Sequence, residues 1–186
     1  MVDLMIFSNP WAMPSKWTFK VPCIMALVRK YANDGKGWAD PFAGKSQFAE
    51  FRNDLNPDNK QPSCLDAAEF LKQMKGPLDG VIFDPPYSLT QVSRSYKKIG
   101  VKGWTKDNPT GGFPLVKDEI MRLVRPGGHV LSFGWNTVGM GKNRGFKKIE
   151  LMCVCHGGNR NDTLCLVEER LGDQEPPPAG WEKAGD

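Results

Sequence analysis

The sequence predicts an α/β fold of the Rossmann-like kind, with one domain, a mostly parallel sheet and an antiparallel hairpin near its C-terminal end. Three observations support this prediction. The 186 residues are enough to build one hydrophobic core. Segments with helical periodicity alternate with short apolar segments of the kind found in buried strands. The last two strand-like segments are joined by a Gly157-Gly158-Asn159 turn, which predicts the hairpin.

Each element has a local signal. Three segments combine apolar residues at helical spacing with a turn signal after them, so helices are predicted over residues 21–31, 64–75 and 115–124. Short apolar or alternating segments predict strands over residues 37–40, 78–83, 129–133, 146–155 and 162–168. The domain is expected to span residues 1–171. Residues 172–186 are acidic and rich in proline, which is typical of a disordered tail.

The charge is positive and unevenly distributed. The formal net charge is +4, but residues 168–186 hold six acidic and two basic side chains, a net −4, so the rest of the chain carries +8. A positive body suits a polyanionic partner such as a nucleic acid. No apolar run reaches the length of a membrane span, and the first 20 residues lack the pattern of a signal peptide. A cytoplasmic protein without membrane contact is therefore expected.

The cysteines predict neither disulfides nor a metal site. There are five of them, an odd number, which favours a reducing compartment. Cys153, Cys155, His156 and Cys165 lie close in sequence but lack the CxxC spacing that is typical of structural zinc. Packed thiols are the simpler interpretation.

The tetrapeptide Asp84-Pro85-Pro86-Tyr87 directly follows the predicted strand over residues 78–83. An aromatic amine is a poor nucleophile because its lone pair is delocalised into the ring, and two acceptors on its N–H groups would draw it towards tetrahedral geometry. Asp84 offers a carboxylate and Pro85 a carbonyl, while the prolines fix the backbone and add no competing donor. Tyr87 offers a ring face on which a base can stack. The tetrapeptide therefore predicts a catalytic centre that activates the exocyclic amine of a nucleobase.

A loop of small residues follows the strand predicted over residues 37–40, and such a loop lets the backbone approach a bound cofactor. The residues expected to bind the cofactor there are Asp40, Pro41, Phe42, Ala43 and Gly44. The stretch after the loop is expected to begin a helix. Gly44-Lys45-Ser46 also matches the end of a phosphate-binding P-loop, but Ala39 stands where that motif requires glycine.

Two acidic residues further along are expected to complete the cofactor site. Asp54, with Leu55 beside it, follows the next strand end and is a candidate for binding ribose hydroxyls. Asp66, with Ala67 beside it, is a candidate for accepting from an adenine amine. The alternative for each carboxylate is a helix cap or a solvated acid. Only 14 positions separate Asp40 from Asp54, against about 20 in dinucleotide-binding folds, so the first helix is expected to be stunted.

These motifs resemble those of the DNA amino-methyltransferases, which modify adenine N6 or cytosine N4. The resemblance covers residues 8–169: Asp40–Gly44 is similar to the family's cofactor loop and Asp84–Tyr87 to its catalytic tetrapeptide. The stretches over residues 134–146 and 156–163 are similar to short phage-type adenine methyltransferases. The resemblance implies a class I methyltransferase fold, S-adenosylmethionine as cofactor with S-adenosylhomocysteine as product, and adenine N6 in DNA as target. It also implies that residues 8–19 close over the methionine end of the cofactor.

DNA is the expected partner, and two groups of residues are candidates for binding it. Basic side chains of the polar stretch over residues 88–114 are expected to hold phosphates: Arg94, Lys97, Lys98, Lys102 and Lys106. Trp135 and Asn136 follow a predicted strand and are candidates for the base pocket, with core packing as the alternative for Trp135. RNA is an alternative substrate, and a catalytically silent nucleic-acid-binding subunit is an alternative function. The chain has no long insertion that could form a separate target-recognition domain. We therefore expect a short or degenerate target sequence, or a second subunit, in a homodimer or as a separate recognition subunit, that supplies the recognition.

Overall fold

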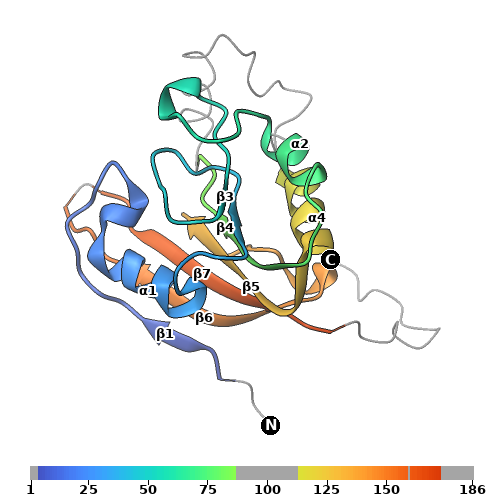
Figure 1. Cartoon of the computed structure of the whole chain (residues 1–186). Helices are drawn as coiled ribbons and strands as arrows, with labels where there is room; N and C mark the ends of the chain where they lie inside the picture. The colour runs from blue at the N-terminus through green and yellow to red at the C-terminus, as the bar shows by residue number, and fades with distance from the viewer. Residues whose placement is uncertain (1–3, 87–112, 159, 173–186) are drawn as a thin grey trace, which may run out of the picture.

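A seven-stranded sheet carries helices on both of its faces in the computed structural model, which describes residues 4–86, 113–158 and 160–172 (Figure 1). The strands are β1 (Ile6–Ser8), β2 (Trp38–Asp40), β3 (Phe51–Arg52), β4 (Leu78–Phe83), β5 (Val124–Gly134), β6 (Phe146–Val154) and β7 (Thr163–Arg170). The helices are α1 (Pro22–Ala32), α2 (Ala67–Lys72) and α4 (Phe113–Leu123), with short 3-10 turns at Thr18–Lys20, Pro57–Asn59 and Lys142–Arg144.

The strand order is β1-β6-β7-β5-β4-β2-β3. Every neighbouring pair is parallel except the two that involve β7, which runs antiparallel to β5 and to β6. The predicted mostly parallel sheet with an antiparallel C-terminal hairpin is thus confirmed. Among the described helices, none has both the length and the apolar composition needed to cross a membrane.

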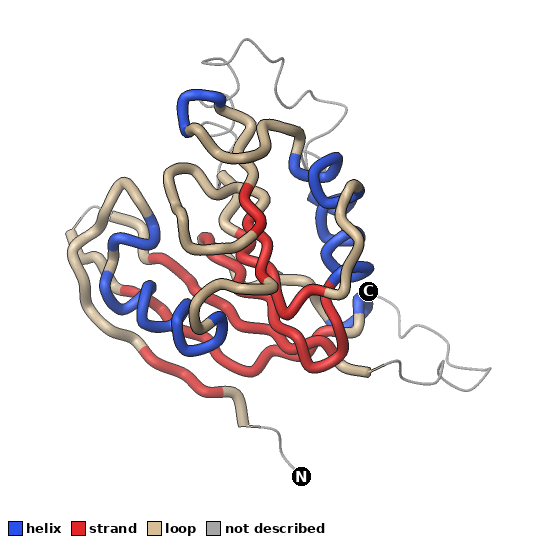
Figure 2. The backbone as a smooth tube through the Cα atoms, viewed as in Figure 1, coloured by secondary structure: helices blue, strands red, loops and turns tan. Residues whose placement is uncertain are grey.

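Two apolar cores lie on opposite faces of the sheet. On one face α1 buries Ile24 and Val28 against Leu131 of β5. On the other face α2 and α4 bury Leu71 and Ile120 against the sheet. Figure 2 shows the strands as a central layer between these two groups of helices. The alternation of helices and strands in the sequence therefore produces three layers, as expected when a sheet is apolar on both faces.

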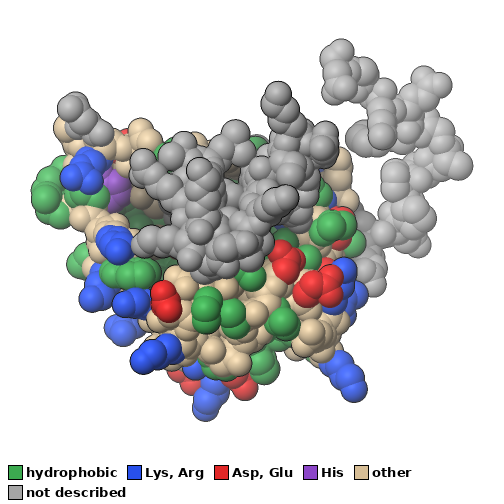
Figure 3. All heavy atoms as spheres, turned by 90° about the horizontal axis from the view of Figure 1, so that it is seen from above, with side chains coloured by type: hydrophobic (Ala, Val, Ile, Leu, Met, Phe, Trp, Pro, Cys, Tyr) green, Lys and Arg blue, Asp and Glu red, His purple; other side chains and the backbone are tan. Residues whose placement is uncertain are grey.

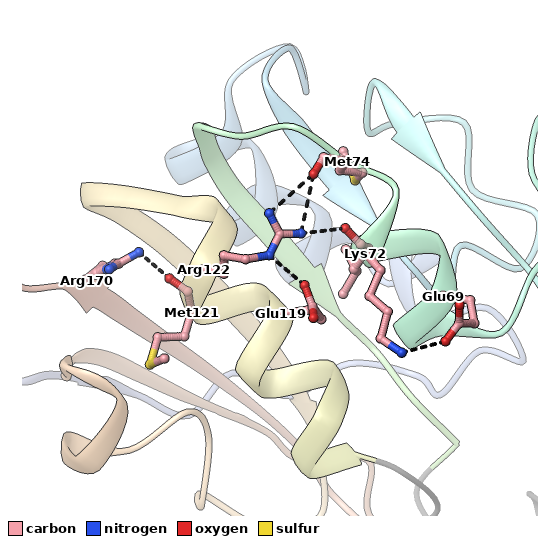
Figure 4. Close-up of polar contacts among 8 residues, drawn as sticks. Glu69, Lys72, Met74, Glu119, Met121, Arg122 and Arg170 are labelled. Carbon is pink, nitrogen blue, oxygen red and sulfur yellow. Dashed lines mark hydrogen bonds and ion pairs between the residues drawn. The ribbon is translucent and has the colours of Figure 1, made fainter.

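Arginine side chains join the helices of the second face to their surroundings (Figure 4). Arg122 of α4 donates to the carbonyls of Leu71 at 3.0 Å and Met74 at 3.3 Å, at the end of α2, and to the Glu119 carboxylate at 2.7 Å. Arg170 of β7 donates to the carbonyl of Met121, near the end of α4. Carbonyls near helix ends can accept bonds from outside their helix, so these guanidinium groups tie the ends of α2 and α4 to their surroundings; the Leu71 carbonyl also accepts from the Met74 N–H at 3.1 Å.

The structure differs from the prediction most clearly in three places. The helix predicted over residues 64–75 begins only at Ala67, because Asp66 caps it: its Oδ1 accepts from the Ala68 N–H at 2.9 Å. Strand β5 begins at Val124, directly after α4, so the Pro126-Gly127-Gly128 turn signal lies within an irregular part of the strand and does not separate helix from strand. Strand β1 was not predicted, because three residues are too few to show a period.

The strand order reverses between β2 and β4. The chain leaves β2 for its neighbour β3 at the sheet edge, whereas it leaves β4 for β5 on the opposite side. The loops after β2 and β4 therefore turn away from each other at the carboxyl ends of the strands. In open α/β sheets a crevice opens at such a point and binds the ligand. The topology thus places the site between Asp40 and Asp84.

The close approach of β4 to its neighbours gives a test of this packing. A Cβ on Gly80 would lie 2.5 Å from the Trp38 ring and 2.6 Å from the carbonyl oxygen of His129. We expect Gly80→Ala to reduce the free energy of unfolding by about 1–3 kcal/mol, the usual cost of overpacking a core. Urea unfolding measures this loss. Gly172→Ala is the control: among the described residues beyond its chain neighbours, no atom comes within 4 Å of the added Cβ, so the midpoint should stay unchanged. Equal stability of the two variants would contradict the packing described here.

Candidate functional site

A cavity of about 1040 Å³ opens at the switch point between β2 and β4. Four stretches of chain supply most of its lining: residues 16–20, 41–48, 53–59 without Pro57, and 84–86. The first stretch precedes α1, the second follows β2, the third follows β3 and the fourth follows β4. Residues far apart in sequence therefore meet at the carboxyl ends of three neighbouring strands, where the sequence analysis placed both candidate motifs.

Asp40 lies beneath the cavity and does not line it. Its side chain has no solvent exposure, and its Oδ1 accepts from the Phe42 N–H at 3.1 Å. Its Oδ2 is buried and has no hydrogen-bond partner among the described residues. Burial, together with the nearby charge of Asp84, raises the pKa of the Asp40 carboxyl well above its usual range. Asp40 thus holds the start of the loop from below, while its neighbours Pro41, Phe42, Ala43 and Gly44 line the cavity.

Asp54 braces the loop after β2. Its Oδ2 accepts from the Gly44 N–H at 2.8 Å, and its Oδ1 accepts from the Asn56 N–H and the Asn59 amide, both at 2.8 Å. Asp54 and Leu55, which are candidates for binding the cofactor, both line the cavity. The Asp54 carboxylate therefore holds the backbone of the cavity wall in place and is itself part of the cavity lining.

The expected helix after the cofactor loop does not form. Residues 41–50 make turns that lead directly into β3. Side chains take the backbone groups that a helix would have paired: the Gln61 amide donates to the carbonyls of Gly44 and Ser46, each at 2.8 Å, and Arg52 donates to the Ala49 carbonyl at 2.5 Å. These local bonds compete with helix formation and leave an open, braced loop.

Asn53 is a structural residue of the site that the sequence analysis missed. Its side chain has no solvent exposure. Its amide donates to the carbonyls of Pro41 at 3.1 Å and Leu65 at 2.9 Å, and its Oδ1 accepts from the Leu65 N–H at 2.9 Å. It therefore ties the loop after β2 to the segment before α2. No local pattern could have revealed this role, because both partners are 12 residues away in sequence.

The segment before α1 forms the opposite wall. The Trp17 ring lies over the loop after β2, close to Gly44, and the ammonium of Lys45 is 5.6 Å from its centre. Upstream, Ala12 donates to the Cys155 carbonyl at 3.1 Å and Cys155 donates to the Pro10 carbonyl at 2.9 Å, which anchors the segment on the hairpin. The segment over residues 8–19 thus reaches the cavity at its C-terminal part, where Lys16 to Phe19 line it.

The candidate catalytic residues enter the cavity from the end of β4. Asp84, Pro85 and Pro86 line it, and Tyr87 lies outside the described residues. Below them three rings pack edge to face: Phe42 and Phe83 at 5.8 Å, Phe83 and Phe113 at 5.9 Å, Phe42 and Phe113 at 6.2 Å. This aromatic contact fixes the loop after β2 against the end of β4, so the two predicted motifs are held together through the core.

The remaining candidates are placed as follows. Ala67 lines the cavity, whereas Asp66 does not, and Asp66 Oδ1 is occupied as the helix cap. Trp135 and Asn136 follow β5 as exposed residues outside the cavity lining, so Trp135 is not a core residue. The predicted phosphate-binding residues lie outside the described part of the chain: Arg94, Lys97, Lys98, Lys102 and Lys106. On the visible parts of the face in Figure 3, other basic side chains are spread along the edge.

A thiol cluster lies away from the cavity, at the hairpin. The sulfurs of Cys153 and Cys155 and a carboxylate oxygen of Asp162 all lie within 4.8 Å of one another. Both ring nitrogens of the adjacent His156 have other contacts, with the Ala12 carbonyl at 2.8 Å and the Thr163 hydroxyl at 2.9 Å. Burial raises the pKa of the Cys153 thiol, which favours its protonated form. The expectation of packed thiols without metal stays a prediction.

Several solved structures share this fold. No protein-family model and no curated protein matches the sequence. TrmN from Thermus thermophilus superposes with a TM-score of 0.54 at 17% identity, over 81% of this chain and 49% of that chain, so this chain spans about half of its length. An rRNA methylase from Streptococcus thermophilus gives 0.51 at 10% identity, over 80% and 97%.

A third structure was determined with a ligand. It is the 1,6-didemethyltoxoflavin-N1-methyltransferase from Burkholderia thailandensis, with bound 1,6-didemethyltoxoflavin and S-adenosylhomocysteine, and it gives 0.51 at 10% identity over 79% and 76% of the two chains. Together with the sheet order, these likenesses confirm the predicted fold class: the chain has the fold of class I S-adenosylmethionine-dependent methyltransferases.

The buried carboxyl of Asp40 predicts a pH dependence of stability. Because its pKa is raised in the folded protein, the unfolded chain loses this proton at a lower pH. Its contribution to stability is therefore complete below the ordinary aspartate pKa, about 4, and is lost as the pH rises towards the raised value. Asp40→Asn has no proton to lose, so its free energy of unfolding should fall less than that of the wild type across this window. Urea unfolding at a series of pH values measures the slopes. The exposed Asp34→Asn is the control, and a wild-type slope in Asp40→Asn would contradict the assignment.

Proposed function

We propose that this chain is an S-adenosylmethionine-dependent methyltransferase that methylates the exocyclic N6 amine of adenine in DNA. One observation carries the proposal: Asp84, Pro85 and Pro86, at the end of β4, line the same cavity as the loop after β2. A catalytic motif and a cofactor loop that the sequence places 40 residues apart thus face one volume at the switch point of the sheet.

The cavity suits a charged nucleoside cofactor. Polar side chains after β3 face it and suit ribose hydroxyls: Asp54, Asn56, Asp58 and Asn59. Lys16, Lys20 and Lys45 line it from two other stretches and suit the carboxylate of a methionine group, while Phe42 and Leu65 suit an adenine ring. When bound, S-adenosylmethionine supplies a methyl group on a positively charged sulfur. The fold shared with the toxoflavin methyltransferase that holds S-adenosylhomocysteine supports the same assignment.

Asp84 and the Pro85 carbonyl would act on the target amine. Both are acceptors, so they can bind the two N–H groups of an exocyclic amine and hold it out of conjugation with the ring. Asp84 also stabilises the positive charge that develops on nitrogen, since a fixed acceptor needs no reorganisation during the reaction. Asp40 lies next to this group: burial, together with the nearby charge of Asp84, raises the pKa of the Asp40 carboxyl well above its usual range.

In the family that the motifs resemble, an aspartate at the head of the tetrapeptide favours adenine N6 over cytosine N4 as the target. The amine of a paired base is inaccessible to the cavity, so the base has to leave the helix. Because the rRNA methylase with this fold acts on a nucleic acid too, RNA is the substrate against which DNA has to be compared. Tritiated methyl transfer to DNA and to RNA of the same sequence separates the two, and methylation of RNA alone would overturn the choice of DNA.

We expect Asp84→Ala to lower kcat by about 10²–10³, the usual effect of losing one transition-state acceptor, because the amine loses its charged partner. Binding of S-adenosylhomocysteine, measured by calorimetry, should stay at one site per chain. Asp79→Ala is the matched control, since Asp79 lies at the other end of β4 and pairs with Arg125 at the surface. Asp79→Ala should keep full activity, and wild-type turnover in Asp84→Ala would refute the catalytic assignment.

We expect single-stranded or mismatched DNA to be methylated at least as fast as duplex DNA, because extracting an unpaired base costs less free energy. The target should comprise one to a few bases, since each specified base pair usually needs a bidentate contact worth about 1–3 kcal/mol. Methylome sequencing of cells that express this chain alone defines the target. A fully modified motif of six or more bases would show the prediction to be wrong.

A further inference from the structure

Glu168 is a buried charge on the face of the sheet that α4 covers. Its side chain has no solvent exposure. Both carboxylate oxygens accept from the backbone of the loop after β5: Oε2 from the Met140 N–H at 2.6 Å and Oε1 from the Gly141 N–H at 3.0 Å. A carboxylate that accepts two backbone N–H groups in the interior makes strong, directional bonds. Glu168 therefore fixes the end of this loop from inside the protein.

Only glycine can occupy position 139 beside this carboxylate. Its φ is +57°, and a Cβ there would lie 2.2 Å from Glu168 Oε2. Both the left-handed backbone and the missing side chain are thus required for the carboxylate to reach the next two amides. The Met140 side chain then packs into the core with an exposure of 3%.

Lys117 holds the loop from the other side. It lies in α4, and its ammonium donates to the Gly139 carbonyl at 2.5 Å. The same ammonium lies 5.8 Å from the centre of the Phe83 ring, in the residue before Asp84. Burial lowers the pKa of Lys117, and the nearby charge of Glu168 acts in the opposite direction. Lys117 thus contacts both the loop after β5 and Phe83, the last residue of β4.

The loop starts beside Asp84. In the parallel pair β4 and β5, Phe83 lies opposite Ser132, so Asp84 leaves the sheet within two residues of Gly134. Between Gly134 and the fixed end at Gly139, the loop exposes Trp135 at 43% and Val138 at 66%. Two further bonds shape it: Asn136 Oδ1 accepts from the Val138 N–H at 3.0 Å, and Lys148 donates to the Thr137 carbonyl at 2.5 Å.

We propose that Glu168 and Lys117 are positioning residues that hold residues 135–138 as a preformed docking surface for the target nucleotide beside Asp84. This inference rests on the proposed function and deepens it. Trp135 offers a ring face for stacking, and Asn136 and the neighbouring backbone offer polar groups for a base edge. Without the contacts of Glu168 and Lys117, the loop would become ordered only when the nucleotide binds, and the entropy lost in that ordering lowers affinity. Neither Glu168 nor Lys117 touches the nucleotide.

The test compares the two buried glutamates of the described residues. In Glu168→Gln an amide N–H₂ replaces one acceptor and faces a backbone N–H, so one of the two loop bonds is lost. In Glu150→Gln the same change falls on β6, where Glu150 accepts from Lys30 at 2.6 Å and Tyr31 at 2.5 Å, in contact with α1 and not with the loop after β5. Both variants remove a buried negative charge and are expected to lose stability, so a general loss of stability cannot explain a difference between them.

We expect Glu168→Gln to raise the KM for an adenine-containing oligonucleotide about tenfold, since displaced positioning groups commonly cost at least this much. The affinity for S-adenosylhomocysteine should not change, because neither Glu168 nor the loop lines the cavity. Glu150→Gln should keep the wild-type KM. Hydrogen exchange, followed by mass spectrometry, should accelerate at Met140 and Gly141 in Glu168→Gln only. If Glu168→Gln does not fold, Lys117→Met, which removes the bond to Gly139 while keeping the apolar stem, should give the same rise in KM.

The outcomes separate the two proposals. Faster exchange at Met140 and Gly141 with a KM equal to that of Glu150→Gln would overturn the inference and leave the proposed function in place. Equal rises in KM in both glutamate variants would also overturn it. A wild-type chain that methylates no nucleic acid would overturn the proposed function, and the docking surface with it.

Discussion

The reversal of strand order between β2 and β4 is the constraint on which the site depends. It places the carboxyl ends of two neighbouring strands together while sending their loops apart. Contacts around the opening fix its walls. The rings of Phe42, Phe83 and Phe113 pack edge to face in the core next to the cavity. Asp54 and Asn53 accept from and donate to the backbone of the loop after β2, which holds that loop in place. Beside this opening lies the buried carboxyl of Asp40, whose Oδ2 has no hydrogen-bond partner in the described part of the chain.

Buried acids recur in this fold with different solutions. Glu150 is paired with a lysine and a tyrosine, and Glu168 accepts from two backbone amides and lies near Lys117. Asp40 accepts one hydrogen bond from the described residues, and burial, together with the nearby charge of Asp84, raises the pKa of its carboxyl well above its usual range. A buried charge has to be paired, bonded or neutralised, and each acid uses a different one of these routes. Asp40, for which the described residues provide no salt bridge, is also the acid that lies near Asp84, the proposed catalytic aspartate.

The sequence predicted the parts of the fold that depend on local pattern. Strand β4 was located to the residue, because a compact apolar run ended at Asp84-Pro85, and α1 was located to within a residue at each end. Predictions failed where distant side chains decide the backbone. The turns after β2 replaced a helix because Gln61 and Asp54 take the amides and carbonyls of that stretch. In the same way, Asn53 belongs to the site only through partners that no spacing rule connects to it, whereas Trp17 lies in the segment over residues 8–19 that the resemblance placed beside the cofactor. The roles expected of Asp66, Trp135 and the other candidates stay predictions.

The N-terminal wall of the cavity depends on the end of the chain. Strand β1 pairs with β6, with Ile6 opposite Glu150, and the segment after β1 is held by Cys155. During synthesis the first twenty residues therefore leave the ribosome long before the strand on which they will rest. Contacts of such sequence separation are slow to form, since the intervening chain has to close a large loop first. The stretch from Lys16 to Lys20 follows a segment whose partners lie in β6 and at Cys155, so this wall of the cavity is completed only after the hairpin has formed.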